Sequence, residues 1–377
     1  MGHIRSGSVA AVAAAVVTGL AGGPAAATGQ DQVPCGATAL RTAIATASPG
    51  ATLVLTSHCA YHLTSAYSGD DGLPAVDRRL TILGQGATIV RDSATAGAFR
   101  ILHVTSTGNL HLEDVTVRGG DAPDDGGGIL VDGGGRLTLV KADVVDNAAG
   151  GQGGGVEVGA GATAVVKHSW LAYDNADTGG GLHNAGTLSV EDTDFSRNHA
   201  RTTGGGVDQT GGSAVYSNSL IRYNTAASAG GGLVDDGGTV EFYDGKIANN
   251  TSSGLAGGVL NRARLTLIRA EVTGNVAGGT GGTGGGILNT AGGALALRDS
   301  LVEGNSANGD SDAHAGGIWN GDATVTLDHT TVRGNASTVA PGGVWTDTPF
   351  TVRDSKIIYN IPTNCTGSPV VVTGCLD

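Results

Sequence analysis

Three ionisable residues that could carry out acid–base chemistry recur at a nearly constant spacing near the middle of the chain. Glu157, His183 and Asp208 each stand two positions after a block of glycines, in GGGVE, GGGLH and GGGVD. An imidazole between two carboxylates is suited to proton transfer, and the same groups could bind a divalent ion through mixed ligands. These three are therefore our candidate catalytic residues. The alternative is that they are solvated side chains on an outer strand.

Two tryptophans occupy the same position after later glycine blocks. Trp319 stands in AGGIW and Trp345 in PGGVW. Aromatic rings placed one repeat apart could hold sugar rings, because an aromatic face is a large apolar surface. We therefore take both as candidate binding residues. The alternative is that they pack beneath a cap at the C-terminal end.

An acidic loop close to the first tryptophan is a candidate metal site. It reads NGDSDAHAGG and contains Asp310, Asp312 and His314. Carboxylate oxygens are the ligands that Ca²⁺ prefers, so this loop could bind Ca²⁺ or another ion. Surface solvation is the alternative interpretation. We expect no other cofactor.

The elements that position these residues belong to a repeat of about 26 residues. Such a period is typical of stacked coils in a solenoid. Each repeat closes on an asparagine and is soon followed by a glycine block: Asn147, Asn175, Asn198, Asn224, Asn250, Asn275, Asn305, Asn335 and Asn360. We expect these residues at a sharp corner that needs a positive φ, with their amides hydrogen-bonded along the stack. The second repeat then has one extra residue before Asn175.

Three apolar columns precede each closing asparagine. The first two are separated by two residues, which is the spacing of side chains on one face of a strand. The second column contains Leu139, Val166, Val190, Tyr216, Phe242, Leu267, Leu297, Leu327 and Val352. A column rich in Asp and Asn, six residues before the asparagine, predicts a turn. Strands that repeat in one direction without helices between them predict a parallel β-helix with a rise of roughly 4.8 Å per coil.

The two ends of the chain differ from the repeats. Residues 1–27 combine a weakly basic start, a short apolar run and a small-residue ending, the features of a secretory signal peptide. Residues 37–47 space their apolar side chains as one helical stripe, which predicts a short helix that caps the first coil. No later segment is long and apolar enough to predict a membrane span.

The four cysteines also lie only near the ends. Export would permit disulfides, because an oxidising compartment preserves them. The positions favour one bond within each end and none between the ends: Cys35–Cys59 and Cys365–Cys375. A metal site that used all four would require the two ends to meet.

Each repeat begins with two glycines and an aliphatic residue, continues with two stretches of alternating apolar and polar residues, and ends with aliphatic-x-x-Asn. This pattern resembles the repeats of bacterial polymorphic outer-membrane proteins. The whole chain resembles secreted right-handed β-helix proteins of the pectate-lyase-like superfamily, on ALRTAI at 39–44 and LTILGQGATIVRD at 80–92. The resemblance implies an all-β, right-handed parallel β-helix of about eleven coils over residues 28–377. Residues 28–60 and 361–377 would form its caps. The superfamily includes polysaccharide lyases, glycoside hydrolases and adhesins.

Charge and motifs leave two hypotheses about function. The formal net charge of −13 argues against nucleic-acid binding, which needs clustered Lys and Arg. The first hypothesis is a secreted, monomeric, non-catalytic protein that binds extracellular carbohydrate or a cell-surface partner. The alternative is a polysaccharide lyase or glycoside hydrolase that acts on extracellular polysaccharide through Glu157, His183 and Asp208.

Overall fold

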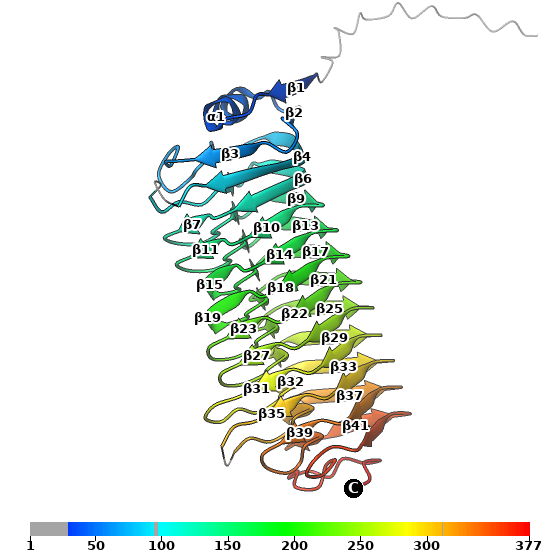
Figure 1. The fold of residues 1–377 in the computed structure, drawn as a ribbon. Helices are drawn as coiled ribbons and strands as arrows, with labels where there is room; N and C mark the ends of the chain where they lie inside the picture. Colours follow the sequence, from blue (N-terminus) through cyan, green and yellow to red (C-terminus); the bar gives the residue numbers. More distant parts are fainter. Residues whose placement is uncertain (1–28, 94–96, 311) are drawn as a thin grey trace, which may run out of the picture.

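The computed structural model describes residues 29–93, 97–310 and 312–377, so the predicted signal peptide lies outside the described residues. The described chain winds into a parallel β-helix, which confirms the predicted fold (Figure 1). The coils stack from one end of the molecule to the other, and the C-terminus lies at the end opposite the only labelled helix. Strands of successive coils pair in parallel and build three long sheets, here named sheets I, II and III.

Sheet I has 23 strands: β1 (Gln30–Val33), β2 (Ala51–Leu55), β3 (Ala60–Leu63), β4 (Arg79–Arg91), β6 (Asn109–Arg118), β9 (Arg136–Val140), β10 (Asp143–Val145), β13 (Thr163–Lys167), β14 (Trp170–Ala172), β17 (Thr187–Glu191), β18 (Asp194–Ser196), β21 (Ser213–Ser217), β22 (Leu220–Arg222), β25 (Thr239–Tyr243), β26 (Lys246–Ala248), β29 (Arg264–Ile268), β30 (Glu271–Thr273), β33 (Ala294–Arg298), β34 (Leu301–Glu303), β37 (Thr324–Asp328), β38 (Thr331–Arg333), β41 (Phe350–Arg353) and β42 (Lys356–Ile358).

Sheet II has 9 short strands: β7 (Asp121–Ala122), β11 (Ala148–Ala149), β15 (Asn175–Thr178), β19 (His199–Thr203), β23 (Thr225–Ala226), β27 (Thr251–Ser252), β31 (Val276–Ala277), β35 (Ser306–Ala307) and β39 (Ala336–Ser337). Sheet III has 10 strands: β5 (Leu102–Val104), β8 (Ile129–Val131), β12 (Val156–Val158), β16 (Leu182–Asn184), β20 (Val207–Gln209), β24 (Leu233–Asp235), β28 (Val259–Asn261), β32 (Ile287–Thr290), β36 (Ile318–Gly321) and β40 (Val344–Thr346).

A typical coil contributes one strand to sheet III, two to sheet I and one to sheet II. The two strands of sheet I meet at the predicted turn, where the Asp- and Asn-rich column has positive φ. The inward columns fill the space between the sheets. The second predicted column is buried from Leu139 to Leu327, and only Val352, in the last coil, is partly exposed. Like side chains therefore stack on like, as the period predicts.

The closing asparagines form the predicted ladder of amides. Asn224 donates from its backbone N–H and from Nδ2 to Oδ1 of Asn250, at 3.0 Å each, and it accepts from Asn198 in the same way. The positive φ lies one residue earlier than predicted, for example at Tyr223 and Asn249, because the asparagine itself turns inward to bond its neighbours.

One rung of this ladder was predicted wrongly. Asp174, not Asn175, occupies the position in the second repeat, and its Oδ1 accepts from the backbone N–H and Nδ2 of Asn147. No extra residue is present, because Asp174 also stands three positions after the buried Leu171, as Asn147 does after Val144. An aspartate was overlooked because only asparagines were aligned.

A second polar ladder, which the sequence did not reveal, lies on the inner face of sheet III. Its buried members are Asn184, Gln209, Asp235, Asn261, Asn289, Asn320 and Thr346. The amides bond along the axis, with Asn184 donating to Gln209 at 2.7 Å and Asn289 donating to Asn320 at 2.7 Å. The amides are tolerated in this core because they are hydrogen-bonded, whereas neither carboxyl oxygen of Asp235 has a hydrogen-bond partner of normal geometry within the described chain.

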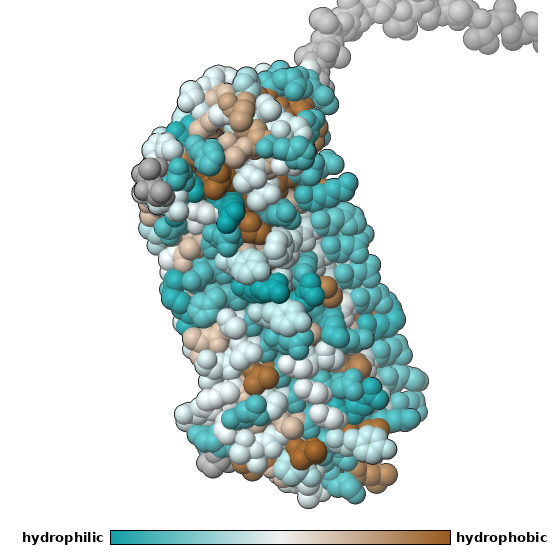
Figure 2. All heavy atoms as spheres, in the orientation of Figure 1, coloured by the Kyte–Doolittle hydropathy of each residue, from teal (hydrophilic) through white to brown (hydrophobic). Residues whose placement is uncertain are grey.

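The two ends carry the predicted features. The helix α1 (Ala37–Thr46) buries Leu40 and Ile44 at the N-terminal end, as expected of a cap (Figure 1). The predicted disulfides are confirmed, with Cα–Cα distances of 5.8 Å for Cys35–Cys59 and 6.4 Å for Cys365–Cys375. No helix among the described residues is long and apolar enough to cross a membrane. The face drawn in Figure 2 is largely hydrophilic, with isolated hydrophobic side chains.

Candidate functional site

The predicted catalytic and binding residues share one column on the outer face of sheet III. In each strand of the sheet the first and third side chains point inward, so the middle one points outward. Parallel pairing aligns the column from coil to coil: His103, Leu130, Glu157, His183, Asp208, Val234, Leu260, Leu288, Trp319 and Trp345. Four of the first five residues of the column are ionisable, Leu130 being the exception, and the other five are apolar or aromatic.

The predicted catalytic residues are adjacent but covered. Nδ1 of His183 lies 2.8 Å from one carboxylate oxygen of Glu157, and its Nε2 lies 3.0 Å from the Thr210 hydroxyl. Asp208 bonds elsewhere, accepting from the Thr203 hydroxyl at 2.8 Å. The side chains of His183 and Glu157 are only 2% and 6% exposed, so the interpretation as solvated side chains is wrong.

Burial is the largest single influence on the pKa of each residue in this cluster, but it sets the direction of the shift only for the two carboxyl groups. It raises the pKa of Glu157, against the opposing effect of the hydrogen bond from His183, and it also raises the pKa of Asp208. Burial alone would lower the pKa of His183, but the hydrogen bond and charge of Glu157 raise it overall. The pair could share a proton. Bond cleavage, however, also needs a surface on which substrate can reach these atoms.

A second histidine cluster, which the sequence reasoning missed, lies at the start of the column. Nδ1 of His103 is 3.0 Å from Asp71, and Nε2 is 3.0 Å from Asp132. Arg100 also binds Asp71, at 2.8 Å. The hydrogen bond that His103 donates to Asp71 is the largest cause that raises the pKa of His103. Extending the column one coil towards the N-terminus would have found His103, but Asp71 comes from a loop outside the repeat.

Both ring nitrogens of His103 are occupied by carboxylates. The cluster therefore fastens the loop that carries Asp71 to the turn that carries Asp132. It leaves neither nitrogen of His103 available to a substrate in this conformation.

The two predicted binding tryptophans line a groove at the other end of the column. Their rings stack on each other with centroids 4.7 Å apart and planes 4° apart. The groove has a volume of about 550 Å³, with Leu288 among its lining residues. Trp319 and Trp345 are only partly buried, so they are not sealed beneath a C-terminal cap.

The predicted metal-binding loop contributes to the same groove. Asp312 and His314 line it, together with Arg262 and Thr290 from the opposite side of the column. Asp310 instead accepts from the backbone N–H of Gly281 at 3.1 Å.

The predicted metal ligands are not gathered into one site. Nδ1 of His314 lies 2.6 Å from the carbonyl oxygen of Ala340. Among the described residues, the group of three possible ligand side chains that lies within 4.8 Å is a different one, Asp328, His329 and Asp354, at an exposed turn. Within it His329 already pairs with Asp328 at 2.9 Å.

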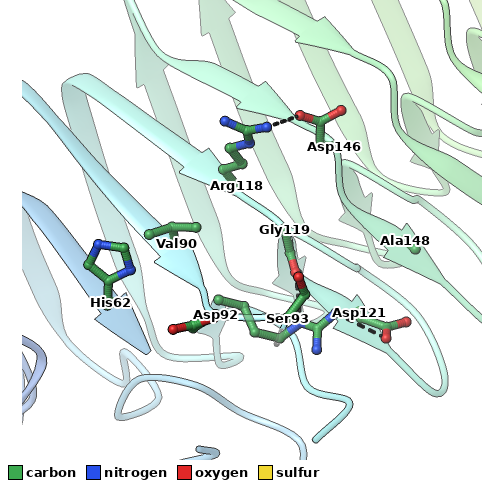
Figure 3. A pocket seen from close by; sticks show the side chains of 11 residues that line it. His62, Val90, Asp92, Ser93, Arg118, Gly119, Asp121, Asp146 and Ala148 are labelled. Atoms are coloured by element: carbon green, nitrogen blue, oxygen red, sulfur yellow. Dashed lines mark hydrogen bonds and ion pairs between the residues drawn. The ribbon is translucent and has the colours of Figure 1, made fainter. Parts of the chain in front are cut away.

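A further groove lies near the N-terminal end, on another side of the β-helix (Figure 3). It has a volume of about 580 Å³ and contains none of the predicted site residues. Its charges compensate one another, since Arg118 pairs with Asp146 at 3.0 Å and Arg91 with Asp121 at 3.1 Å. These ion pairs link neighbouring coils, so we assign the groove no ligand.

A family model agrees with the architecture. Residues 100–256 match a family model described as "Right handed beta helix region". No curated protein matches the chain. Two solved structures of mutants of the periplasmic alginate epimerase AlgG are similar at 13% and 12% identity, each over 85% of this chain and 83% of that chain, with TM-scores of 0.41 and 0.43.

The pectate lyase Pel9A is similar at 15% identity over 88% of this chain and 75% of that chain, with a TM-score of 0.32. At TM-scores below 0.5 these likenesses carry no argument about this chain. The matched residues 100–256 fall within sheets that continue regularly on both sides of them. The protein is thus a right-handed parallel β-helix of about eleven coils.

Proposed function

We propose that the protein binds carbohydrate in the groove formed by Trp319, Trp345 and Leu288. The observation that carries this proposal is the stacked tryptophan pair at one end of the groove. Trp345 covers one face of Trp319, and Trp319 also packs against the cluster of the preceding coils that includes Leu288. The parts of both rings that stay exposed line the groove and are available to a ligand. A sugar ring could pack there against an apolar wall and an apolar floor.

Polar groups stand where the hydroxyls of such a ring would need partners. Thr290 and Arg262 line one side of the groove, and Asp312 and His314 line the other. The single guanidinium among them is already paired, since Arg262 binds Asp236 at 2.7 Å. We therefore infer a neutral glycan as the ligand. A volume of about 550 Å³ lies in the range of small-ligand sites.

We favour binding over catalysis because of the burial of Glu157, His183 and Asp208. Relative exposures of 5%, 2% and 2% leave no surface on which a scissile bond could approach them. The stacked tryptophans, in contrast, border an open groove. We further infer that the protein acts outside the cytoplasm, since its two disulfides would persist in an oxidising compartment.

The test is to titrate the protein with neutral oligosaccharides and to compare Trp319→Ala with the wild type. We expect the substitution to weaken binding roughly tenfold or more, as for the loss of a central aromatic anchor. Tyr359→Ala is the matched control, because this tyrosine is 80% exposed and lies outside the groove. Circular dichroism checks that both variants remain folded. Equal affinities of Trp319→Ala and the wild type would contradict the proposal.

A further inference from the structure

Three consecutive coils carry large side chains at a backbone position that holds Asp, Asn or Gly in most other coils. The residue before each rung of the amide ladder has a positive φ, and in the other coils it is Asp146, Asn249, Gly274, Gly304, Gly334 or, in the last coil, Tyr359. Tyr173, Arg197 and Tyr223 occupy this position with φ of 59°, 59° and 56°. A left-handed conformation is unfavourable for bulky residues, although the turns of this β-helix also impose it on others, such as Lys141 and Arg269.

The three side chains form one exposed stack, here named the Tyr–Arg–Tyr stack. The Arg197 guanidinium carbon lies 5.7 Å from the ring centre of Tyr173 and 5.6 Å from that of Tyr223. Both tyrosines are nearly half exposed, at 47% and 46%. Trp170 packs edge-on against Tyr173 at 5.8 Å and donates from its indole N–H to the Ser196 hydroxyl at 2.8 Å.

Arg197 makes no ion pair within the described residues, although acidic residues outnumber basic ones by 34 to 21 in this chain. Two aspartates of this part of the β-helix are paired with other arginines, since Arg222 binds Asp194 at 2.7 Å and Arg118 binds Asp146 at 3.0 Å. Rings on both faces of a guanidinium leave its N–H donors pointing outward in its own plane. That is the geometry in which arginine binds a carboxylate through two parallel hydrogen bonds.

We infer that the Tyr–Arg–Tyr stack is a docking surface for an acidic protein segment, with a carboxylate of the partner bound to the edge of Arg197. Tryptophan, tyrosine and arginine are the residue types that dominate binding energy at protein interfaces. Here Trp170, Tyr173, Arg197 and Tyr223 meet on one surface of a chain with only 4% aromatic residues. This surface borders sheet I and is distinct from the carbohydrate groove on sheet III.

The test measures binding of a fluorescently labelled poly-L-glutamate peptide at low ionic strength. We expect saturable binding that Arg197→Gln weakens roughly tenfold, the effect of losing hydrogen bonds to a charged group. Arg298→Gln is the matched control, because Arg298 is exposed, makes no cation–π contact within the part of the chain that the structure describes and belongs to a distant coil. It removes the same charge and should leave the affinity close to that of the wild type.

A second variant separates binding from folding. Tyr173→Gly combined with Tyr223→Gly removes both rings and places glycine where the backbone favours it. We expect an unchanged or higher melting temperature together with weaker peptide binding. Trp319→Ala should leave peptide binding unchanged, which distinguishes this surface from the carbohydrate groove.

Several outcomes would overturn the inference. They are no binding of poly-L-glutamate by the wild type, equal losses in Arg197→Gln and Arg298→Gln, or full binding by the double glycine variant. Binding of polygalacturonate in place of the peptide, with the same dependence on Arg197, would also overturn it, because the partner would then be a carboxylated polysaccharide.

Discussion

Replacing Asp235 by asparagine should stabilise the protein, and the gain should grow as the pH rises. Asp235 is fully buried in the inner ladder of sheet III, between Gln209 and Asn261. Neither of its carboxyl oxygens has a hydrogen-bond partner of normal geometry, although the nearby N–H of Gly237 slightly favours the ionised form. Burial, and then the charge of Asp236, raise the pKa of Asp235 to about 7.

The raised pKa fixes both the sign and the size of the effect. The folded protein holds a proton on Asp235 that the unfolded chain releases near its ordinary value of 3.8. This group's contribution to stability is therefore fully present below pH 3.8 and is lost as the pH rises to about 7. A shift of about three pKa units corresponds to about 4 kcal/mol of unfolding free energy. An asparagine does not titrate, and its amide could donate to Asn261 as other rungs do.

The assay is thermal unfolding of the wild type and Asp235→Asn at several pH values from 4 to 8. We expect similar melting temperatures in acid and a clearly higher melting temperature for the variant at pH 8. The exposed Asp299→Asn is the control and should show no such pH-dependent difference. A difference between Asp235→Asn and the wild type that stays constant across the pH range would refute the reasoning, since it would not come from a proton on Asp235.

Other substitutions test the stacking and the ends. Leu267→Ala, in the middle of an inward column, should cost about 2–5 kcal/mol of unfolding free energy, whereas Asp192→Asn on the outer turn should cost far less; the reverse order in thermal melts would invalidate the register. Asn224→Ala should lower the free energy of unfolding by about 1–3 kcal/mol for each buried donor that it leaves unpaired, such as the backbone N–H of Asn198. Denaturant titration would measure this loss. Reduction of the two disulfides should expose the terminal coils first to hydrogen exchange; uniform loss of protection would count against the end-clamp model.

The fold could be predicted from the sequence because the coils repeat. Each coil contributes one side chain to each inward column. A residue such as Leu267 is therefore buried against its counterparts Phe242 and Leu297, and the lengths and sequences of the loops do not change this. The disulfide pairing followed from the same logic, because a rod keeps its ends apart. The aspartate at position 174 was not predicted as a rung, because the repeat was defined by its asparagines. Burial raises the pKa of Asp174 well above its ordinary value, and a protonated carboxyl group can replace an amide in the ladder.

The candidate sites were harder to predict, because their environment depends on loops that do not repeat. Glu157 and His183 lie on an outer strand, yet they are buried. The groove beside Trp319 is lined by His314 and Arg262, from loops on opposite sides of the column, and no periodicity brings these together. The inner amide ladder was missed because buried polar residues look like surface residues until their stacking is known.

The most direct test of the central claim is to incubate the purified protein with a panel of neutral and acidic glycans and to measure both retention and bond cleavage. Our account predicts that a neutral glycan is retained, that Trp319→Ala abolishes the retention, and that no glycan is cut. The account would be contradicted if the wild type cleaved any glycan and this cleavage disappeared in Glu157→Gln or His183→Ala. The buried pair would then be an active site and not part of the scaffold.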